Sequence, residues 1–176
     1  GLANQEVFNS GAKLVAGQNA AVVTNQFVDQ FITFGGSDLT LGLVCTMLYF
    51  SKSRQYKELG KLSIIPGLFN INEPIIFGFP VVFNPIMAIP FILAPVISVI
   101  MVYTSIATGI VEPFRAISVP WTTPFIISGF LIGGVKAAIL QIAVFSMTVA
   151  VYFPFFKYQD KLAYQEEQKI GTEATV

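Results

Sequence analysis

The feature of this sequence that most constrains its fold is how few charges its central part carries. Between Leu62 and Val111 the only charged residue is Glu73. Over the whole chain, charged residues make up 11% of the composition, whereas an ordinary soluble domain carries about 25%. The mean hydropathy is +0.70. Because so few charges cannot cover a surface that faces water, the sequence predicts an integral membrane protein in contact with the lipid bilayer.

Two stretches have the length and composition of transmembrane helices. A helix needs about 20 mainly apolar residues to cross the hydrocarbon core, and residues 86–107 and 133–156 meet this requirement. The first contains Pro90 and Pro95, which packed membrane helices tolerate because neighbouring groups satisfy the freed carbonyls. A third apolar stretch, residues 39–50, is too short to cross alone and is expected to continue an element before it. The expected fold class is an all-α membrane protein.

Positive charges closely follow two of the apolar stretches. Residues 52–61 hold four basic residues and one acidic residue, and a second charged stretch begins at Lys157. We expect both stretches to be loops. Since cytoplasmic loops are enriched in Lys and Arg next to the membrane, both are predicted to lie on the cytoplasmic side. An even number of crossings then separates them, which residues 86–107 and 133–156 provide.

Three other segments are interrupted where a spanning helix would be continuous. Residues 64–80 are apolar at both ends but hold two Asn, a Glu and a Pro in their middle, and residues 119–125 have a similar character. Transporters use non-helical backbone at membrane depth to bring polar groups to a midplane site. We therefore predict re-entrant helical hairpins. Residues 29–40, with a Gly-rich cluster at 34–38, form either another such hairpin or an ordinary loop between two helices.

Glu73 is the strongest candidate for a functional residue. A lone carboxylate costs about 3 kcal/mol at the centre of a membrane helix, so such residues usually mark a substrate site or a proton pathway. Asn70 and Asn72 add amide donors and acceptors suited to a ligand rich in hydroxyl groups. The alternative is structural: Glu73 begins a re-entrant helix and compensates its dipole, or it lies at the water interface.

Trp121, the only Trp, also has two interpretations. Its flat apolar ring could support a sugar ring beside the hydroxyls of Thr122 and Thr123, or it could belong to the aromatic belt at the membrane interface. Glu112 and Arg115 are three residues apart, and we expect them to form a structural ion pair across one helical turn.

The composition argues against several other functions. The chain has no His, and its single cysteine, Cys45, lies in an apolar run without metal-ligand spacing, so we expect no metal site and no cofactor. The sequence also lacks a basic tract, so we expect no nucleic-acid partner. The chain starts at Gly1 without a basic, cleavable leader. We therefore expect a fragment of a longer protein, with a disordered tail over residues 171–176.

Several motifs make the sequence similar to a known family. The longer ones are Tyr-Lys-Glu-Leu-Gly-Lys at 56–61, Pro-Gly-Leu-Phe-Asn-Ile-Asn-Glu-Pro-Ile-Ile-Phe-Gly at 66–78, Asn-Pro at 84–85 and Val-Pro-Trp-Thr-Thr-Pro at 119–124. Shorter matches at 35–37, 40–42 and 153–157 keep the same order along the chain. Together they resemble the lactose, cellobiose and diacetylchitobiose class of sugar permeases of the phosphotransferase system (PTS), the IIC component.

This resemblance implies a multi-pass permease of the bacterial inner membrane that acts as a homodimer. It implies binding of a β-linked disaccharide such as cellobiose, chitobiose or lactose, whose 6-hydroxyl is presented to a phosphorylated IIB partner that works with IIA. Residues 1–170 correspond to the C-terminal, substrate-binding part. Glu73, in the Asn-Glu-Pro motif, is the implied catalytic residue that contacts the reactive hydroxyl. With the polar neighbours described above, the predicted substrate-binding residues are Gly36, Ser37, Asn70, Asn72, Glu73, Trp121, Thr122 and Thr123.

The sequence departs from this family in three respects. The family's N-terminal half, with its dimer contact and a sugar-site His, has no counterpart in the chain, and Asp38 stands where a small residue is common. Whether the chain acts as an enzyme stays open because the implied phosphoryl donor belongs to IIB. The competing functions are a cation- or proton-coupled transporter with Glu73 as proton carrier, and an accessory membrane subunit.

Overall fold

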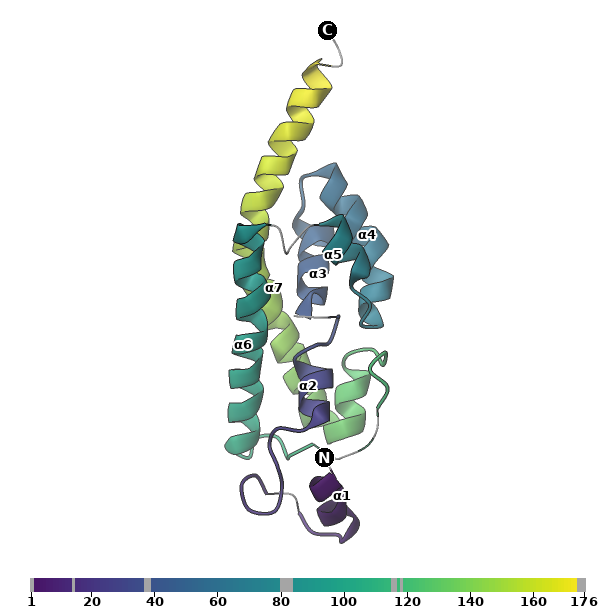
Figure 1. Ribbon diagram of the computed structural model, residues 1–176, viewed down its shortest axis with the longest axis vertical. Helices are drawn as coiled ribbons and strands as arrows, with labels where there is room; N and C mark the ends of the chain where they lie inside the picture. The colour runs from purple at the N-terminus through teal and green to yellow at the C-terminus, as the bar shows by residue number, and fades with distance from the viewer. Residues whose placement is uncertain are drawn as a thin grey trace.

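The computed structural model describes residues 2–13, 15–36, 39–79, 84–114, 117 and 119–173. Within these residues the chain forms helices joined by turns and loops, without β-strands. The helices are α1 (Leu2–Asn9), α2 (Asn25–Phe31), α3 (Leu41–Phe50), α4 (Arg54–Leu68), α5 (Glu73–Gly78), α6 (Pro85–Ala107) and α7 (Ile127–Glu173) (Figure 1). The prediction of an all-α fold is therefore confirmed.

Helices α6 and α7 have the length and apolar character needed to cross a bilayer, as predicted. Helix α6 begins at Pro85, whose missing N–H is no loss in the first turn of a helix. The Asn84 side chain caps this turn by accepting hydrogen bonds from the backbone N–H groups of Ile86 at 3.0 Å and Met87 at 3.4 Å. Pro90 and Pro95 lie inside the helix without ending it.

Helix α7 is two helical pieces joined by a reversal at Gly134. This residue has φ 70° and ψ −160°, a backbone conformation that glycine adopts without steric cost. The short piece, residues 127–133, runs back alongside the start of the long piece (Figure 1). The interruption predicted at residues 119–125 is therefore a non-helical segment that leads into a helical hairpin, whose turn is at Gly134.

Helices α4 and α5 form the hairpin predicted for residues 64–80. The chain turns after Leu68, and α5 then packs back against α4. The contact is close at Gly78, where a built Cβ atom would lie 2.5 Å from a methyl carbon of Leu59. The end of this segment at Pro80 lies outside the described residues.

The segment at residues 29–40 does not form a hairpin, so that interpretation of the sequence is wrong. Helices α2 and α3 lie nearly end to end instead of side by side (Figure 1). Both pack against α7, while α2 also contacts α6 and α3 also contacts α4. The packing surface of α7 keeps the two helices in one line, which is interrupted between the end of α2 at Phe31 and the start of α3 at Leu41.

The two charged stretches that we expected to be loops are mostly helical. Helix α4 begins at Arg54, and α7 continues past Lys157 to Glu173 with Pro154 inside it. Lys, Arg, Glu, Gln and Leu favour helix strongly, so the change from apolar to charged residues marks no helix end. Helical structure also extends into the first part of the tail for which we predicted disorder. Residues 174–176 lie outside the described residues.

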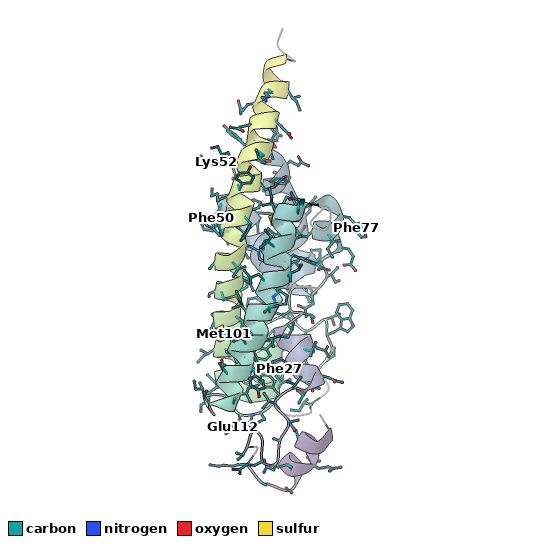
Figure 2. The ribbon with its side chains drawn as sticks, turned by 60° about the vertical axis from the view of Figure 1, so that its left-hand side comes forward. Phe27, Phe50, Lys52, Phe77, Met101 and Glu112 are labelled. Carbon is teal, nitrogen blue, oxygen red and sulfur yellow. The ribbon has the colours of Figure 1, made fainter. Side chains whose placement is uncertain are left out.

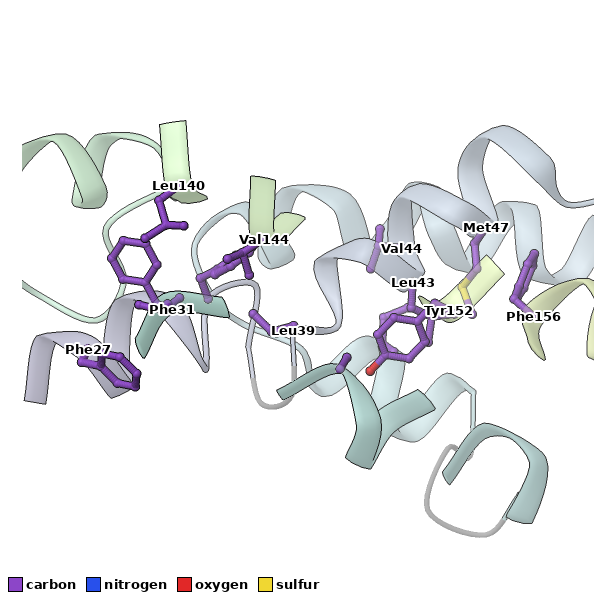
Figure 3. Close-up of a cluster of buried hydrophobic side chains, with 14 of the residues drawn as sticks. Phe27, Phe31, Leu39, Leu43, Val44, Met47, Leu140, Val144, Tyr152 and Phe156 are labelled. Carbon is purple, nitrogen blue, oxygen red and sulfur yellow. The ribbon is translucent and has the colours of Figure 1, made fainter. Parts of the chain in front are cut away.

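The core follows one face of the long piece of α7. Its buried residues recur every three or four positions, the spacing that places side chains on one helix face. The middle of this stripe packs against α3 (Figure 3). The residues that Figure 3 shows there are Val144, Tyr152 and Phe156 from α7 with Leu43, Val44 and Met47 from α3. The stripe also includes buried polar residues, Gln141 toward one end, Thr148 in the middle and Asp160 toward the other end.

The two basic stretches lie at the same end of the molecule, as predicted. The buried Asp160 carboxylate accepts hydrogen bonds from the Ser51 hydroxyl at 2.6 Å and from the backbone N–H groups of Lys52 and Ser53. The Lys157 ammonium donates to the Phe50 carbonyl at 2.7 Å. Figure 2 shows Lys52 and Phe50 toward one end and Glu112 toward the other.

Candidate functional site

Three interrupted segments meet at the side chain of Asn70. Its amide oxygen accepts a hydrogen bond from the backbone N–H of Gly35, in the α2–α3 interruption. Its amide nitrogen donates to the carbonyls of Trp121 and, at 3.3 Å, Thr123, which precede the hairpin at Gly134. One side chain in the α4–α5 turn therefore links the other two segments. The turn lies about halfway along α6 (Figure 1).

The local backbone explains why an Asn stands at this turn. Asn70 has φ 64°, in the left-handed region that Asn tolerates better than most residues. The turn closes on Pro66, whose carbonyl accepts hydrogen bonds from the N–H groups of Phe69 at 2.9 Å and Ile71 at 3.0 Å. With both Asn70 amide hydrogens given to carbonyls, this residue serves chiefly to position the segments around it.

Gly35 and Gly36 allow the α2–α3 interruption to approach the α4–α5 turn. Both have positive φ, 75° and 94°. A Cβ atom built on Gly36 would lie 2.3 Å from Cβ of Asn72, and one built on Gly35 would lie 2.3 Å from Cβ of Leu41. Both the backbone conformation and the close contact therefore require glycine at these positions.

A pocket of about 360 Å³ opens where the three segments meet. Its lining is polar apart from one aromatic ring, and it consists of Asp29, Thr33, Gly36, Asn70, Asn72, Glu73 and Trp121. Five of the eight predicted binding residues are thus brought together. Thr122 and Thr123 are not part of the lining, although the Thr123 carbonyl bonds to Asn70. Ser37 lies outside the described residues, as does Arg115 of the predicted ion pair.

Asp29 and Thr33 are pocket residues that the sequence reasoning missed. They are four positions apart, and the Thr33 hydroxyl donates to the Asp29 backbone carbonyl at 3.1 Å. Phe27, Phe31 and Phe34 around them are buried in the core. This alternation of buried aromatic and outward polar residues at helical spacing was the signal that could have identified them.

Glu73 occupies a position that suits both interpretations made from the sequence. It is the first residue of α5, followed by Pro74, so its carboxylate lies at the positive end of a short helix. It is also exposed and lines the pocket. Its neighbour Asn72 is buried and precedes the helix as its N-cap residue.

Trp121 is 61% exposed, and it lines the pocket instead of lying at a helix end. Its carbonyl is fixed by Asn70. Two carboxylates, two amides, a hydroxyl and an indole ring thus surround one cavity, a set suited to a ligand with many hydroxyl groups. Among the residues that the structure describes, no three His, Cys, Asp or Glu side chains are grouped to hold a metal ion.

Comparisons with known proteins agree with one another. The family described as "Phosphotransferase system, EIIC" matches residues 1–95. The lichenan permease IIC component of Bacillus subtilis (strain 168) is 42% identical over 170 residues, which cover 96% of this chain and 36% of that protein. The cellobiose-specific EIIC component of the PTS from Geobacillus stearothermophilus is 51% identical over 149 residues, 84% of this chain and 33% of that protein.

A solved structure extends the likeness to the fold. The crystal structure of the transporter ChbC, the IIC component from the N,N'-diacetylchitobiose-specific phosphotransferase system, matches with a TM-score of 0.89 and 42% sequence identity. The match covers 94% of this chain and 38% of that one. The chain thus spans about a third of the length of these relatives. By sequence and by fold, the chain belongs to the EIIC family of membrane permeases of the phosphotransferase system.

Proposed function

We propose that this chain forms the sugar-binding part of a multi-pass permease of the bacterial inner membrane that transports a β-linked disaccharide with coupled phosphorylation. The observation that carries the proposal is the polar pocket in which Glu73, Asn72 and Trp121 converge. Its volume of about 360 Å³ lies within the range of about 300–1,000 Å³ usual for small-molecule sites. Relatives named for cellobiose and N,N'-diacetylchitobiose support a β-linked disaccharide as the ligand.

In this proposal Glu73 contacts the sugar 6-hydroxyl that accepts the phosphoryl group. The carboxylate takes the hydroxyl proton as the sugar oxygen attacks phosphorus. A new O–P bond forms, the S–P bond to the phosphocysteine of the IIB partner breaks, and the cysteine leaves as a thiolate. Since phosphoryl transfer depends mostly on positioning and charge stabilisation, the pocket's main task is to hold the sugar against Trp121. IIA supplies IIB, and the whole permease works as a homodimer through contacts outside this chain.

The test replaces Glu73 by Gln in a full-length permease that contains this chain. Phosphorylation of cellobiose by phosphorylated IIB should fall by roughly 100-fold or more, the usual contribution of a general base, while the protein still inserts into the membrane. Glu112→Gln is the matched control, because Glu112 is also followed by Pro and exposed but lies outside this pocket. Normal phosphorylation by Glu73→Gln would rule out the proposed role.

One observation favours a second candidate function. Asp29 and Glu73 line the same pocket, and acidic residues at membrane depth also serve as proton carriers. A proton-coupled permease would accumulate unmodified sugar in vesicles without IIB, and a protonophore would abolish that accumulation. Phosphorylated sugar inside the vesicles, dependent on IIB and insensitive to the protonophore, supports the phosphotransferase function instead.

A further inference from the structure

A groove between α6 and α7 is separate from the proposed sugar pocket. It encloses about 560 Å³ and shares no lining residue with the pocket at Glu73. Met101 and Ser105 from α6 form one wall, and Lys136, Ile139 and Ala143 from α7 form the other. Within each wall the residues are three, four or seven positions apart, so each wall is one face of a helix.

The groove runs inward from one end of the two helices. Lys136 comes two residues after the reversal at Gly134, and Ala143 lies about 10 Å further along α7 by helical rise. On the other wall, Ser105 is close to the end of α6 at Ala107, and Met101 is one turn deeper. Figure 2 shows Met101 at a level between Glu112 and Phe50. One end of the groove is thus near the ends of both helices, and the other lies about 10 Å further along them, on the side of their apolar middle.

Lys136 places a single positive charge at the outer end of this groove. It is exposed, and no described residue forms an ion pair or a hydrogen bond with its ammonium group. Two other lysines differ in this respect: Lys61 pairs with Glu58 at 2.7 Å, and Lys157 donates to a backbone carbonyl. A lysine in a membrane helix is rare and usually pairs with another group or reaches the interface.

The rest of the lining is almost entirely apolar. Ile139 and Ile110 are 60% and 63% exposed. The Ser105 hydroxyl donates to the Met101 carbonyl at 2.7 Å, which satisfies it within its own helix. A groove with one cation at the interface end and hydrocarbon surface beyond it complements a molecule with an anionic head and an apolar tail. A small soluble anion would leave the apolar wall uncovered, and a neutral lipid would leave the ammonium without a counter-ion.

We propose that this groove binds one anionic phospholipid, with its phosphate on the Lys136 ammonium. One acyl chain lies against Ile139, Ala143 and Met101 and extends toward the bilayer centre. The site stabilises the contact between α6 and the start of α7, next to the reversal at Gly134. This proposal does not depend on which sugar is carried or on the role of Glu73.

The experiment uses the full-length permease in detergent, titrated with phosphatidylglycerol or with phosphatidylcholine. Native mass spectrometry counts the bound lipid, and thermal unfolding reports stabilisation. Wild type should retain phosphatidylglycerol in preference to phosphatidylcholine. Lys136→Gln should lower the affinity of the permease for phosphatidylglycerol about five-fold, as expected for one basic residue near an anionic headgroup, and remove the preference.

Ala143→Phe should fill the groove and reduce the binding of both lipids. Lys161→Gln, an exposed lysine on the far part of α7, is the control and should behave like wild type.

Several outcomes would overturn the proposal. One is equal stabilisation of wild type by the two lipids. Another is an unchanged preference for phosphatidylglycerol in Lys136→Gln, which decides the question even if Ala143→Phe does not fold. A third is failure of Ile139→Cys to react with a thiol reagent in lipid-free permease of a Cys45→Ala background, because Ile139 is exposed here and this would mean that another part of the protein covers the groove.

Discussion

At the scale of single residues, the shape of the pocket at Glu73 depends on how closely backbone segments approach one another. Gly36 contributes no side chain, yet it lets the α2–α3 interruption contact Asn72. Asn70 was expected to bind substrate, and the structure uses its amide to join Gly35, Trp121 and Thr123. A sequence motif identifies such residues as belonging to the site but does not distinguish those that touch a ligand from those that position others.

Gly36→Ala should reduce sugar phosphorylation about 100-fold, because a misplacement of about 1 Å at a reacting site has that effect. The added methyl group would meet Asn72 at 2.3 Å and displace the residue next to Glu73. Gly17→Ala is the matched control: Gly17 has a similar φ of 76°, but a built Cβ would meet nothing within 4 Å. Both variants carry the conformational penalty of about 1–2 kcal/mol for a left-handed residue, so both should unfold at a lower temperature. Only Gly36→Ala should lose activity, and equal activities in the two variants would contradict the argument.

At the scale of elements, buried polar side chains on α7 hold the interrupted segments in place. Gln141 is fully buried and accepts hydrogen bonds from the N–H groups of Ile126 at 2.6 Å and Gly129 at 3.0 Å. Its amide nitrogen donates to the Ser128 hydroxyl at 2.9 Å and to the Gln30 carbonyl at 2.7 Å. The hairpin of α4 and α5 was predictable from the polar residues and proline within an apolar segment, but this anchor was not, because a Gln within an apolar helix gives no indication of its partners.

Gln141→Leu should loosen the hairpin at Gly134. The variant leaves the N–H of Gly129 buried without its hydrogen-bond acceptor. A buried donor without an acceptor destabilises the folded hairpin by about 1–3 kcal/mol. Hydrogen exchange at residues 126–130 should therefore accelerate by about 5- to 150-fold while exchange in α6 stays unchanged. Gln165→Leu, at an exposed position of α7, is the control. Unchanged exchange at residues 126–130 in Gln141→Leu would show that packing alone holds the hairpin.

The attachment of α4 to the far part of α7 should depend on pH. The hydrogen bond from Ser53 at 2.6 Å, with those from the backbone N–H groups of Gln55 and Arg54, holds the pKa of Glu167 below its usual 4.5. A carboxyl group whose pKa is lower in the folded state stabilises the fold at pH values above its unfolded-state pKa. This stabilisation is lost as the pH falls through the folded-state pKa. Exchange protection at residues 54–56 should therefore be full at neutral pH and decline below about pH 4.5.

The comparison that isolates Glu167 uses two neighbouring substitutions. Glu167→Gln should show reduced protection of residues 54–56 already at pH 7 and a weaker dependence on acid. Glu166→Gln, at an exposed position one residue earlier, should keep the wild-type profile. The same acid dependence in both variants would show that Glu167 is not its source.

At the scale of the whole molecule, the two basic stretches lie together at one end. The long piece of α7, residues 135–173, measures about 58 Å by helical rise, whereas the hydrocarbon core of a bilayer is about 30 Å thick. Its charged final part must therefore project beyond the membrane. Since Lys and Arg concentrate on the cytoplasmic side, this end is expected to face the cytoplasm, where a IIB partner would approach the pocket.

Cysteine labelling tests this orientation. In a Cys45→Ala background, Lys161→Cys should react with a membrane-impermeant thiol reagent in inside-out vesicles only. Thr108→Cys, at the exposed opposite end of α6, should react in intact spheroplasts only. Both sites are exposed, so a difference in labelling reports sidedness. The reverse pattern would show that the basic end faces outward, and the pocket would then have to be reached by IIB from the other side.

The amino-acid sequence was enough to predict the membrane character, the α6 and α7 spans and the interrupted segments around Glu73. These follow from composition, apolar run length and the positions of proline and glycine, which act locally. The tertiary structure alone decided that α2 and α3 align end to end, that Asn70 and Gln141 serve as anchors, and that Asp29 shares the pocket with Glu73. These features depend on contacts between residues up to 111 positions apart, and no local pattern encodes which partners a buried polar group will find.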